Sequence, residues 1–427
     1  MQDIKLIREH PEIIKKDLKK RRDEEKIKMV DNAIEYDKKW RGMTQEVNKL
    51  RQKRNVITQE IAELKKKGKD FKTKMKQVKE IPAKIKKLET QVEDYKKKID
   101  YILMKLPNIL HESVPYGKDE NDNVVIKTWG KPPKFDFKPK THMEIMKNLG
   151  LVDAERAAKV SGTGFLYLKN DMVLLDLAIQ RFAIDFLMKK GYTLIEPPFM
   201  INRKAYEGMI DFEDFEMVTY NVAGTDLYLI ATSEHPMGAM YLDEVLDKKD
   251  LPIKFVGVSP CFRKEVGTHG KYTKGLFRMH QFNKIEQFIF CLPKDSWKFH
   301  EEIQNNSEQL YQQLGLHYHV VNVCTGDIGT IAAKKYDIEV WMADGQFRES
   351  GSNSNCTSYQ ARRLNIRYRE KEGQAPAGFV NTLNNTALAT SRTMMAILEQ
   401  FQQKDGSVII PKILRPFMNG IERLEKK

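Results

Sequence analysis

Apolar residues in the first quarter of the chain follow a heptad pattern, in which steps of three and four residues alternate. A first series runs through Ala33, Tyr36, Trp40, Met43, Val47, Leu50, Ile57, Ile61 and Leu64, interrupted by Arg54. A second series runs through Val78, Ile81, Ile85, Leu88, Val92, Tyr95, Ile99, Ile102 and Leu106. The break at 65–70 contains Gly68 and is rich in lysine. The pattern predicts an antiparallel pair of helices at about residues 30–106, roughly 50 Å long at ~1.5 Å per residue.

Proline and lysine add detail to this arm. Pro82 should kink or open the returning helix near its start, and Pro107 should end it. Such heptads are also typical of a dimerising coiled coil, and lysines on the outside of one usually form a solvated surface. The tight turn and its basic residues favour an intramolecular arm, and a stiff rod with basic faces can lie along an RNA duplex, where it would read shape and phosphates rather than bases. The candidate RNA-binding residues are Lys65, Lys66, Lys67, Lys69 and Lys72.

The rest of the chain mixes helical and strand patterns, which predicts an α+β fold. Residues 111–140 are rich in proline and polar residues and are predicted to be a linker between a domain at 1–110 and a second at 141–427. Short helices are expected at 142–149 and 154–160, and a longer amphipathic helix at 171–190. Gly191 should close that helix before a strand at 192–196.

Two extended segments between residues 259 and 286 carry the most informative chemistry. Alternation in the first puts Arg263 and Glu265 on one face of a strand. The second puts Arg278, His280, Phe282, Lys284 and Glu286 on one face. Guanidiniums for phosphates, a ring for a base and a carboxylate for an amine suit a nucleoside triphosphate. The alternative is a hairpin with a salt-bridged solvent face. The glycine-rich, basic loop at 266–275 is expected to be a flexible flap.

Composition narrows the class of protein and its partners. The formal net charge is +14 with a pI near 9.2, which favours a phosphate-rich partner, nucleic acid before membrane. The four cysteines form no CxxC pair, which argues against a zinc knuckle or a disulfide scaffold and for a reducing compartment. The chain shows neither a bilayer-spanning apolar run nor a signal-peptide core, so we expect a cytoplasmic location.

Several stretches resemble one family. Residues 262–267 (FRKEVG) and 275–288 (GLFRMHQFNKIEQF) resemble the second motif of class II aminoacyl-tRNA synthetases, in the form of seryl-tRNA synthetases. Residues 171–198 resemble the first motif, which forms the family's dimer interface, and 382–392 resemble the third. The resemblance implies an α+β, antiparallel-sheet class II catalytic domain with an N-terminal antiparallel coiled-coil arm. It also implies a homodimer of the common type rather than of the zinc-dependent methanogen type.

The implied activity is ATP-dependent activation of L-serine, with Mg²⁺, and its transfer to tRNA(Ser), or also to tRNA(Sec) in a host that makes one. The family's serine contacts fall on Thr232, Ser233, Glu234, Glu286, Asn384 and Thr386. Its ATP contacts fall on Arg263, Lys264, Glu265, Arg278, Met279, Phe282, Glu349, Ser350, Gly351, Ser352 and Arg392. Arg263 and Arg392 are the implied catalytic residues, and Glu349 and Ser352 the implied magnesium ligands.

The sequence also departs from the family pattern. Asn353 replaces a usual cysteine, Ser358 replaces a frequent aspartate, and His235 has no assigned role. One rival interpretation is a synthetase-like ligase that loads a carrier protein, but such proteins lack a long arm like residues 33–106. Another is a coiled-coil RNA-binding protein with a decayed ATP pocket, which the intact site residues oppose.

Overall fold

The computed structural model describes residues 1–211, 215–265 and 275–426. The chain divides into two compact units, residues 1–107 and 108–427. Among the described residues, none of the helices is both long and apolar enough to cross a lipid bilayer. All four cysteines are buried free thiols.

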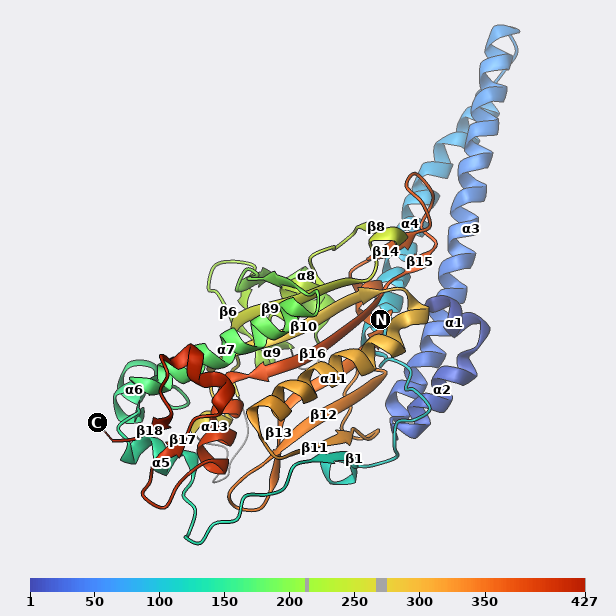
Figure 1. Cartoon of the computed structure of the whole chain (residues 1–427). Helices are drawn as coiled ribbons and strands as arrows, with labels where there is room; N and C mark the ends of the chain where they lie inside the picture. The colour runs from blue at the N-terminus through green and yellow to red at the C-terminus, as the bar shows by residue number, and fades with distance from the viewer. Residues whose placement is uncertain (212–214, 266–274, 427) are drawn as a thin grey trace. The chain divides into compact units, whose positions relative to one another are not determined.

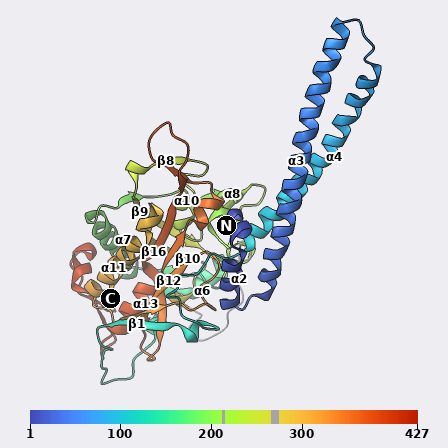
Figure 2. The same ribbon diagram turned by 90° about the vertical axis from the view of Figure 1, so that its right-hand side faces the viewer.

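The first unit is helical. Two short helices, α1 (Ile4–Glu9) and α2 (Pro11–Lys20), precede the long helices α3 (Glu24–Lys66) and α4 (Lys72–Lys105). Asp23 accepts a hydrogen bond from the Lys26 N–H at 3.0 Å, so α3 begins well before the first predicted heptad position. The predicted two-helix arm is confirmed: α3 and α4 lie side by side over their length (Figures 1 and 2).

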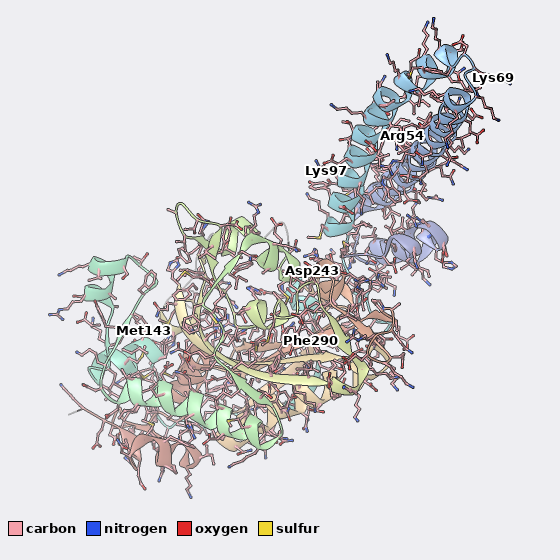
Figure 3. All side chains as sticks on the ribbon, turned by 90° about the horizontal axis from the view of Figure 1, so that it is seen from above. Arg54, Lys69, Lys97, Met143, Asp243 and Phe290 are labelled. Atoms are coloured by element: carbon pink, nitrogen blue, oxygen red, sulfur yellow. The ribbon has the colours of Figure 1, made fainter. Side chains whose placement is uncertain are left out.

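The interior of this arm is the predicted heptad core. Its buried cluster is made of Val47, Ile57, Ile61, Ile81 and Ile85. Arg54 is exposed, as its polar side chain in the apolar series requires, and α4 continues as a helix through Pro82. Figure 3 shows Lys69 at the turn between the helices, with Arg54 and Lys97 farther along them. The arm therefore has an apolar interior and a strongly basic turn.

The second unit is built on an eight-stranded sheet in the order β1-β11-β12-β13-β16-β10-β9-β4. The strand bounds are β1 Val124–Trp129, β4 Thr193–Ile195, β9 Ile253–Phe262, β10 Gln281–Cys291, β11 Tyr318–Asn322, β12 Lys334–Trp341, β13 Phe347–Thr357 and β16 Asn381–Ala389. Strand β4 pairs with β9 in parallel and the other neighbours are antiparallel. The predicted α+β, antiparallel-sheet fold class is confirmed.

Strand β1 lies inside the segment predicted to be a linker. It pairs with β11 through Val124↔Asn322 to Trp129↔Tyr318, with a bulge between Val125 and Lys127. Residues 111–140 thus contribute an edge strand to the sheet rather than a plain connection. The strand is short and lies between proline-rich turns, and its residues do not alternate between apolar and polar, so the sequence gives little sign of it.

Helices cover both faces of this sheet. Helices α7 (Asp171–Lys189), α11 (Ser296–Leu314) and α13 (Thr390–Gln400) share one apolar cluster with the strands, and Figure 1 shows α7 and α11 on one face. On the other face, α8 (Arg203–Met209), α10 (Glu234–Gly238) and α12 (Tyr359–Arg363) pack around Phe288 and Phe290. Because side chains alternate along β10, even-numbered residues point to this second face.

Smaller elements complete the second unit. The predicted short helices are confirmed as α5 (His142–Asn148) and α6 (Ala154–Ser161), and α9 spans Phe215–Val218. Four small sheets pair β2 (Val152–Asp153) with β3 (Tyr167–Leu168), β5 (Met200–Asn202) and β6 (Tyr220–Asn221) with β7 (Leu227–Leu229), β8 (Val245–Asp247) and β15 (Gly378–Phe379) with β14 (Arg367–Arg369), and β17 (Val408–Ile409) with β18 (Arg423–Leu424). The small sheet of β5, β7 and β6 comes directly before residues 230–234, which line the site.

Candidate active site

The hairpin of β9 and β10 forms one wall of the site, but its strands are shorter than predicted. Pairing ends at Gln281↔Phe262, followed by a hydrogen bond from the Arg263 N–H to the His280 carbonyl at 2.9 Å. Glu265 has a φ of +46°, a left-handed conformation in which a strand cannot continue. The prediction that alternation extends through Glu265 and begins at Arg278 is therefore wrong. The predicted flap, apart from Gly275, lies outside the described residues.

A cavity of about 480 Å³ opens where this hairpin meets β13, β16 and the start of α10. Its lining includes Thr232, Glu234, His235, Arg263, Glu265, Lys284, Glu286, Glu349, Ser352, Ser354, Asn384 and Thr386. A smaller cavity adjoins it and shares Arg263, Glu265, Lys284, Glu349 and Thr386. The smaller cavity adds Phe277, Met279, Phe282, Ser350, Gly351 and Arg392. Together they form a site with two compartments.

Thr232 and Glu234 lie at the start of a helix rather than on a continuing strand. Strand β7 ends at Leu229, and α10 begins at Glu234, whose N–H donates to the Thr232 hydroxyl at 3.1 Å. The Glu234 carboxylate accepts from the side-chain amides of Gln360 and Asn384, each at 3.0 Å. Burial and then the charge of Glu286 raise the pKa of the Glu234 carboxyl to about 7, although Lys284 acts against this.

Glu286 faces Glu234 across the larger cavity from the middle of β10. Its carboxylate forms an ion pair with Lys284 and accepts from the Thr386 hydroxyl at 3.3 Å. The Lys284 ammonium lies 3.5 Å from the same hydroxyl. The pairing of β10 with β16 brings these side chains together, because Glu286 lies opposite Thr386, next to a bulge. The larger cavity thus contains two carboxylates in different electrostatic settings.

The smaller compartment combines guanidiniums with aromatic rings. The Arg263 guanidinium lies 5.3 Å from the centroid of the Phe282 ring, and that of Arg392 lies 4.9 Å from the Phe277 ring. Arg392 also donates to the Glu349 carbonyl at 2.6 Å and approaches the Glu349 carboxylate at 3.4 Å. Aromatic rings beside two guanidiniums can bind both the base and the phosphates of a nucleotide.

Glu349 and Ser352 lie together on β13. The Ser352 hydroxyl donates to the Glu349 carboxylate at 3.2 Å. Burial acts to raise the pKa of the Glu349 carboxyl, but Arg392, Lys335 and Arg263 outweigh it and lower that pKa. Gly351 between them packs closely on the next strand: a Cβ there would lie 3.1 Å from the Thr386 Cβ and carbonyl oxygen. The strand therefore presents an ionised carboxylate and a hydroxyl toward the place where the two compartments meet.

Three predicted site residues do not line either compartment. The Ser233 side chain is buried beneath the site, against Gly257 of β9, because the chain turns it toward the core just before α10 begins. The Lys264 N–H donates to the Val218 carbonyl at 3.1 Å, and Arg278 forms an ion pair with Glu265 at 3.1 Å. These three residues therefore adjoin the site without facing either cavity.

Sequence reasoning missed Lys284 and Ser354 as site residues. Lys284 shares the period-two face of β10 with Phe282 and Glu286, so the signal was present in the alternation itself. Ser354 lies two residues from Ser352 on β13. His235 also lines the cavity; burial, with Lys284 and Arg263 nearby, lowers the pKa of its imidazole to about 3, which keeps it neutral.

The departures from the family pattern have local structural partners. The buried Asn353 side chain donates to the His300 carbonyl at 3.0 Å and to Gln304 at 3.2 Å, on the α11 side of the sheet. Ser358 precedes α12, where its hydroxyl accepts from Arg362 at 3.0 Å. Neither residue lines the two compartments.

The antiparallel sheet with these groups on its central strands is the catalytic core of a class II aminoacyl-tRNA synthetase. The model of the tRNA synthetase class II core domain (G, H, P, S and T) matches residues 216–401. A Giardia lamblia prolyl-tRNA synthetase structure, 19% identical with a TM-score of 0.55, covers 65% of this chain, and 57% of its own chain is covered. That likeness supports the fold alone.

The comparisons also identify the family within this class. The seryl-tRNA synthetase N-terminal domain model matches residues 1–110. A serine–tRNA ligase from Methanocella arvoryzae is 56% identical over 99% of this chain and 100% of its own length. The structure of the Pyrococcus horikoshii seryl-tRNA synthetase complexed with ATP is 51% identical, covers both chains fully and has a TM-score of 0.95. The chain belongs to the seryl-tRNA synthetase family and is a serine–tRNA ligase of class II.

Proposed function

We propose that the two substrates bind side by side: L-serine binds in the larger compartment, between Glu234 and Glu286, and ATP extends from the residues that both cavities share into the smaller one. The observation that carries this proposal is that the cavities share Arg263, Glu349 and Thr386. A group bound in one compartment therefore adjoins a group bound in the other. The two reactants then meet inside the protein, in a setting that holds them in place for reaction.

Serine recognition falls to the opposed carboxylates. Glu234, with Thr232, accepts the α-ammonium, which brings three donors and a full positive charge. Glu286 and Thr386 receive the side-chain hydroxyl, and Asn384 fixes the Glu234 carboxylate from the next strand. An amino acid without the hydroxyl would leave these buried polar groups unpaired, which is the more effective way to discriminate substrates.

ATP recognition uses the hairpin and the start of α13. Phe282 stacks on the adenine ring, Glu265 accepts from its amine, and Met279, Ser350 and Gly351 line the nucleotide. Arg263 holds the α-phosphate, and Arg392 holds the γ-phosphate and covers the adenine from the other side. Arg263 lies over the Phe282 ring in this structure, so ATP binding requires its guanidinium to move toward the phosphates.

Glu349 and Ser352 are the residues suited to hold Mg²⁺. An ionised carboxylate and a hydroxyl 3.2 Å apart are hard oxygen ligands, and a magnesium ion completes its shell with phosphate oxygens and water. Bound there, the ion would supply positive charge against the phosphates. Among the described residues there is no cluster of three or more histidine, cysteine, aspartate or glutamate side chains that could hold a metal. Such a site would therefore depend on ATP for its remaining ligands.

The chemistry needs no nucleophile from the protein. A carboxylate oxygen of serine attacks the α-phosphorus, the bond to the β-phosphate oxygen breaks, and pyrophosphate leaves with seryl-adenylate in place. A hydroxyl of the terminal ribose of tRNA then attacks the seryl carbonyl carbon, and AMP leaves. Arg263 and Arg392 stabilise the negative charge that builds up on the phosphates, which is the largest contribution that fixed side chains make here.

The arm and the apolar surface of the second unit suggest the macromolecular partners. The lysines at the α3–α4 turn would bind phosphates of tRNA(Ser), and of tRNA(Sec) where the host has one. Val173 and Leu177 on α7 and Leu194 on β4 are exposed, in the part of the chain that resembles the family's dimer motif. These apolar side chains support a homodimer, in which each arm would serve tRNA bound to the other subunit.

Serine-dependent exchange of pyrophosphate into ATP without tRNA, followed by charging of purified tRNA(Ser), tests this function. We expect both activities. Exchange without charging would instead favour a ligase that loads a carrier protein. Absence of exchange would favour a non-enzymatic RNA-binding protein.

A further inference from the structure

Lys284 is a buried cation at the centre of the site to which the proposed function gives no role. It lies on β10 between Phe282 and Glu286, and its side chain lines both compartments. The residue is 5% exposed, so its charge is held away from bulk water. A lysine buried to this degree needs a partner of opposite charge, and Glu286 supplies it.

The two carboxylates that face serine differ in one respect. Glu286 is neutralised by Lys284, whose ammonium also lies 3.5 Å from the Thr386 hydroxyl. Glu234 accepts from neutral groups, the amides of Gln360 and Asn384. In the described part of the chain no lysine or arginine forms an ion pair with Glu234. The pocket therefore has one carboxylate compensated by a direct ion pair and one, Glu234, on which Lys284 and Arg263 act only from a distance and which we call uncompensated.

This asymmetry matters because serine offers two hydrogen-bond donors of different charge. A carboxylate without a cation binds an ammonium in preference to a hydroxyl, since the charged hydrogen bond is the stronger one. Two uncompensated carboxylates would compete for the α-ammonium. They would also accept an amino acid whose side chain carries a second ammonium. A neutralised carboxylate still accepts a hydrogen bond from a hydroxyl, but it gains little from another positive charge.

We propose that Lys284 is a specificity-determining residue, which neutralises Glu286 so that this carboxylate takes the serine hydroxyl and rejects a cationic side chain. The proposal rests on the proposed function, because it assumes that serine binds between Glu234 and Glu286. On this proposal, the difference in charge between the two carboxylates directs the α-ammonium of serine to Glu234, in addition to the shape of the pocket. The substrate class that Lys284 excludes is that of small amino acids with a side-chain ammonium.

L-2,3-diaminopropionate is the matched probe, because an ammonium replaces the serine hydroxyl on the same carbon skeleton. The measurement is kcat/KM in pyrophosphate exchange for serine and for the probe, at one pH low enough that both amino groups of the probe are protonated. Lys284→Gln is the main variant, since glutamine can still donate to Glu286 but has no charge, and Lys284→Met is a second one. We expect the ratio of serine to probe to fall by roughly 100-fold in both, because a buried charge loses its partner.

Two further variants separate charge from packing. Lys284→Arg keeps the positive charge, so its ratio should stay near that of the unmodified enzyme. Glu286→Gln leaves the Lys284 ammonium without a partner of opposite charge. The ratio of serine to probe should therefore rise in this variant, because the lone ammonium repels the cationic probe. The matched control is Lys254→Met on the neighbouring strand β9, where a lysine pairs with Glu302 at 2.7 Å outside both cavities. Its ratio should be unchanged.

An unchanged ratio in Lys284→Gln and Lys284→Met, with serine exchange intact, overturns the proposal. An equal fall of this ratio in Lys284→Gln and Lys284→Arg also overturns it, since a lysine that acts through packing and not through charge would give that result. If the uncharged variants do not fold, as a melting curve would reveal, the direction of change in Glu286→Gln decides the question. Absence of serine exchange in the unmodified enzyme would instead refute the proposed function itself.

Discussion

Glu234 shows how a single buried carboxyl can set the working range of the site. It faces Glu286, with Lys284 and Arg263 as the nearby cations, and burial together with Glu286 raises the pKa of its carboxyl to about 7. Below that pH the free enzyme carries a neutral acid at this position. Under the proposed function the serine ammonium binds the ionised form, because it pairs directly with the carboxylate, which neither nearby cation does.

We therefore predict that kcat/KM for serine falls by about tenfold per pH unit below pH 7 and levels off above it. The sign follows from the raised pKa: protons and serine compete for the same carboxylate, and protons win at lower pH. A pH profile of serine-dependent pyrophosphate exchange measures this. The profile at saturating serine is the control, since bound substrate keeps Glu234 ionised. A profile in which kcat/KM falls only below pH 5 would contradict the assignment of this pH dependence to Glu234.

The helical arm shows how charge is distributed within an element. Near the end of α4 the lysines are paired along the helix: Lys96 with Asp100 at 2.5 Å, Lys97 with Glu93 at 2.8 Å and Lys98 with Asp94 at 2.7 Å. At the turn, residues 65–72 carry five lysines and a single carboxylate, Asp70. The turn is thus a strongly positive part of the arm, suited to phosphates.

Changing Lys65, Lys66, Lys67, Lys69 and Lys72 to alanine should raise KM for tRNA(Ser) by about tenfold or more. It should also make binding less dependent on salt, because the slope falls by about 0.7 to 0.9 for each phosphate that a lysine no longer neutralises. Serine activation without tRNA should be unaffected. The matched control changes Lys96, Lys97 and Lys98 to alanine, where neighbouring carboxylates already compensate the charge, and there we expect a much smaller effect. Equal effects in the two variants would refute the prediction that the tRNA contacts of the arm are centred on the turn.

At the level of helices and strands, the sequence predicted the elements that hydrophobic periodicity marks, and it missed features that depend on backbone conformation and long-range pairing. The heptads located α3 and α4, and the amphipathic pattern located α7. The predicted ends of β9 and β10 were wrong: pairing ends at Phe262 and Gln281, the Lys264 N–H donates to the Val218 carbonyl instead, and Glu265 is left-handed, a conformation that a glutamate does not signal. Strand β1 was missed because it alternates poorly and gains its stability from β11, nearly two hundred residues away.

For the whole molecule, motifs predicted most of the residues that line the site, but not how they are held. The sequence places Thr232 and Glu234 together, yet a helix start rather than a strand brings both to the cavity. It places Lys284 and its partner Glu286 on one face of β10, but Thr386, which contacts both, comes beside them only when β10 and β16 are in register. Long-range pairing of this kind is set by tertiary packing, which local patterns do not contain.

The central claim is that one face of the sheet holds serine and ATP in adjoining compartments. A crystal structure with a seryl-sulfamoyl analogue of the adenylate tests it most directly. We expect the adenine ring between Phe282 and Arg392, the α-ammonium on Glu234 and the serine hydroxyl on Glu286. An analogue bound elsewhere, or bound with its ammonium on Glu286, would contradict the account.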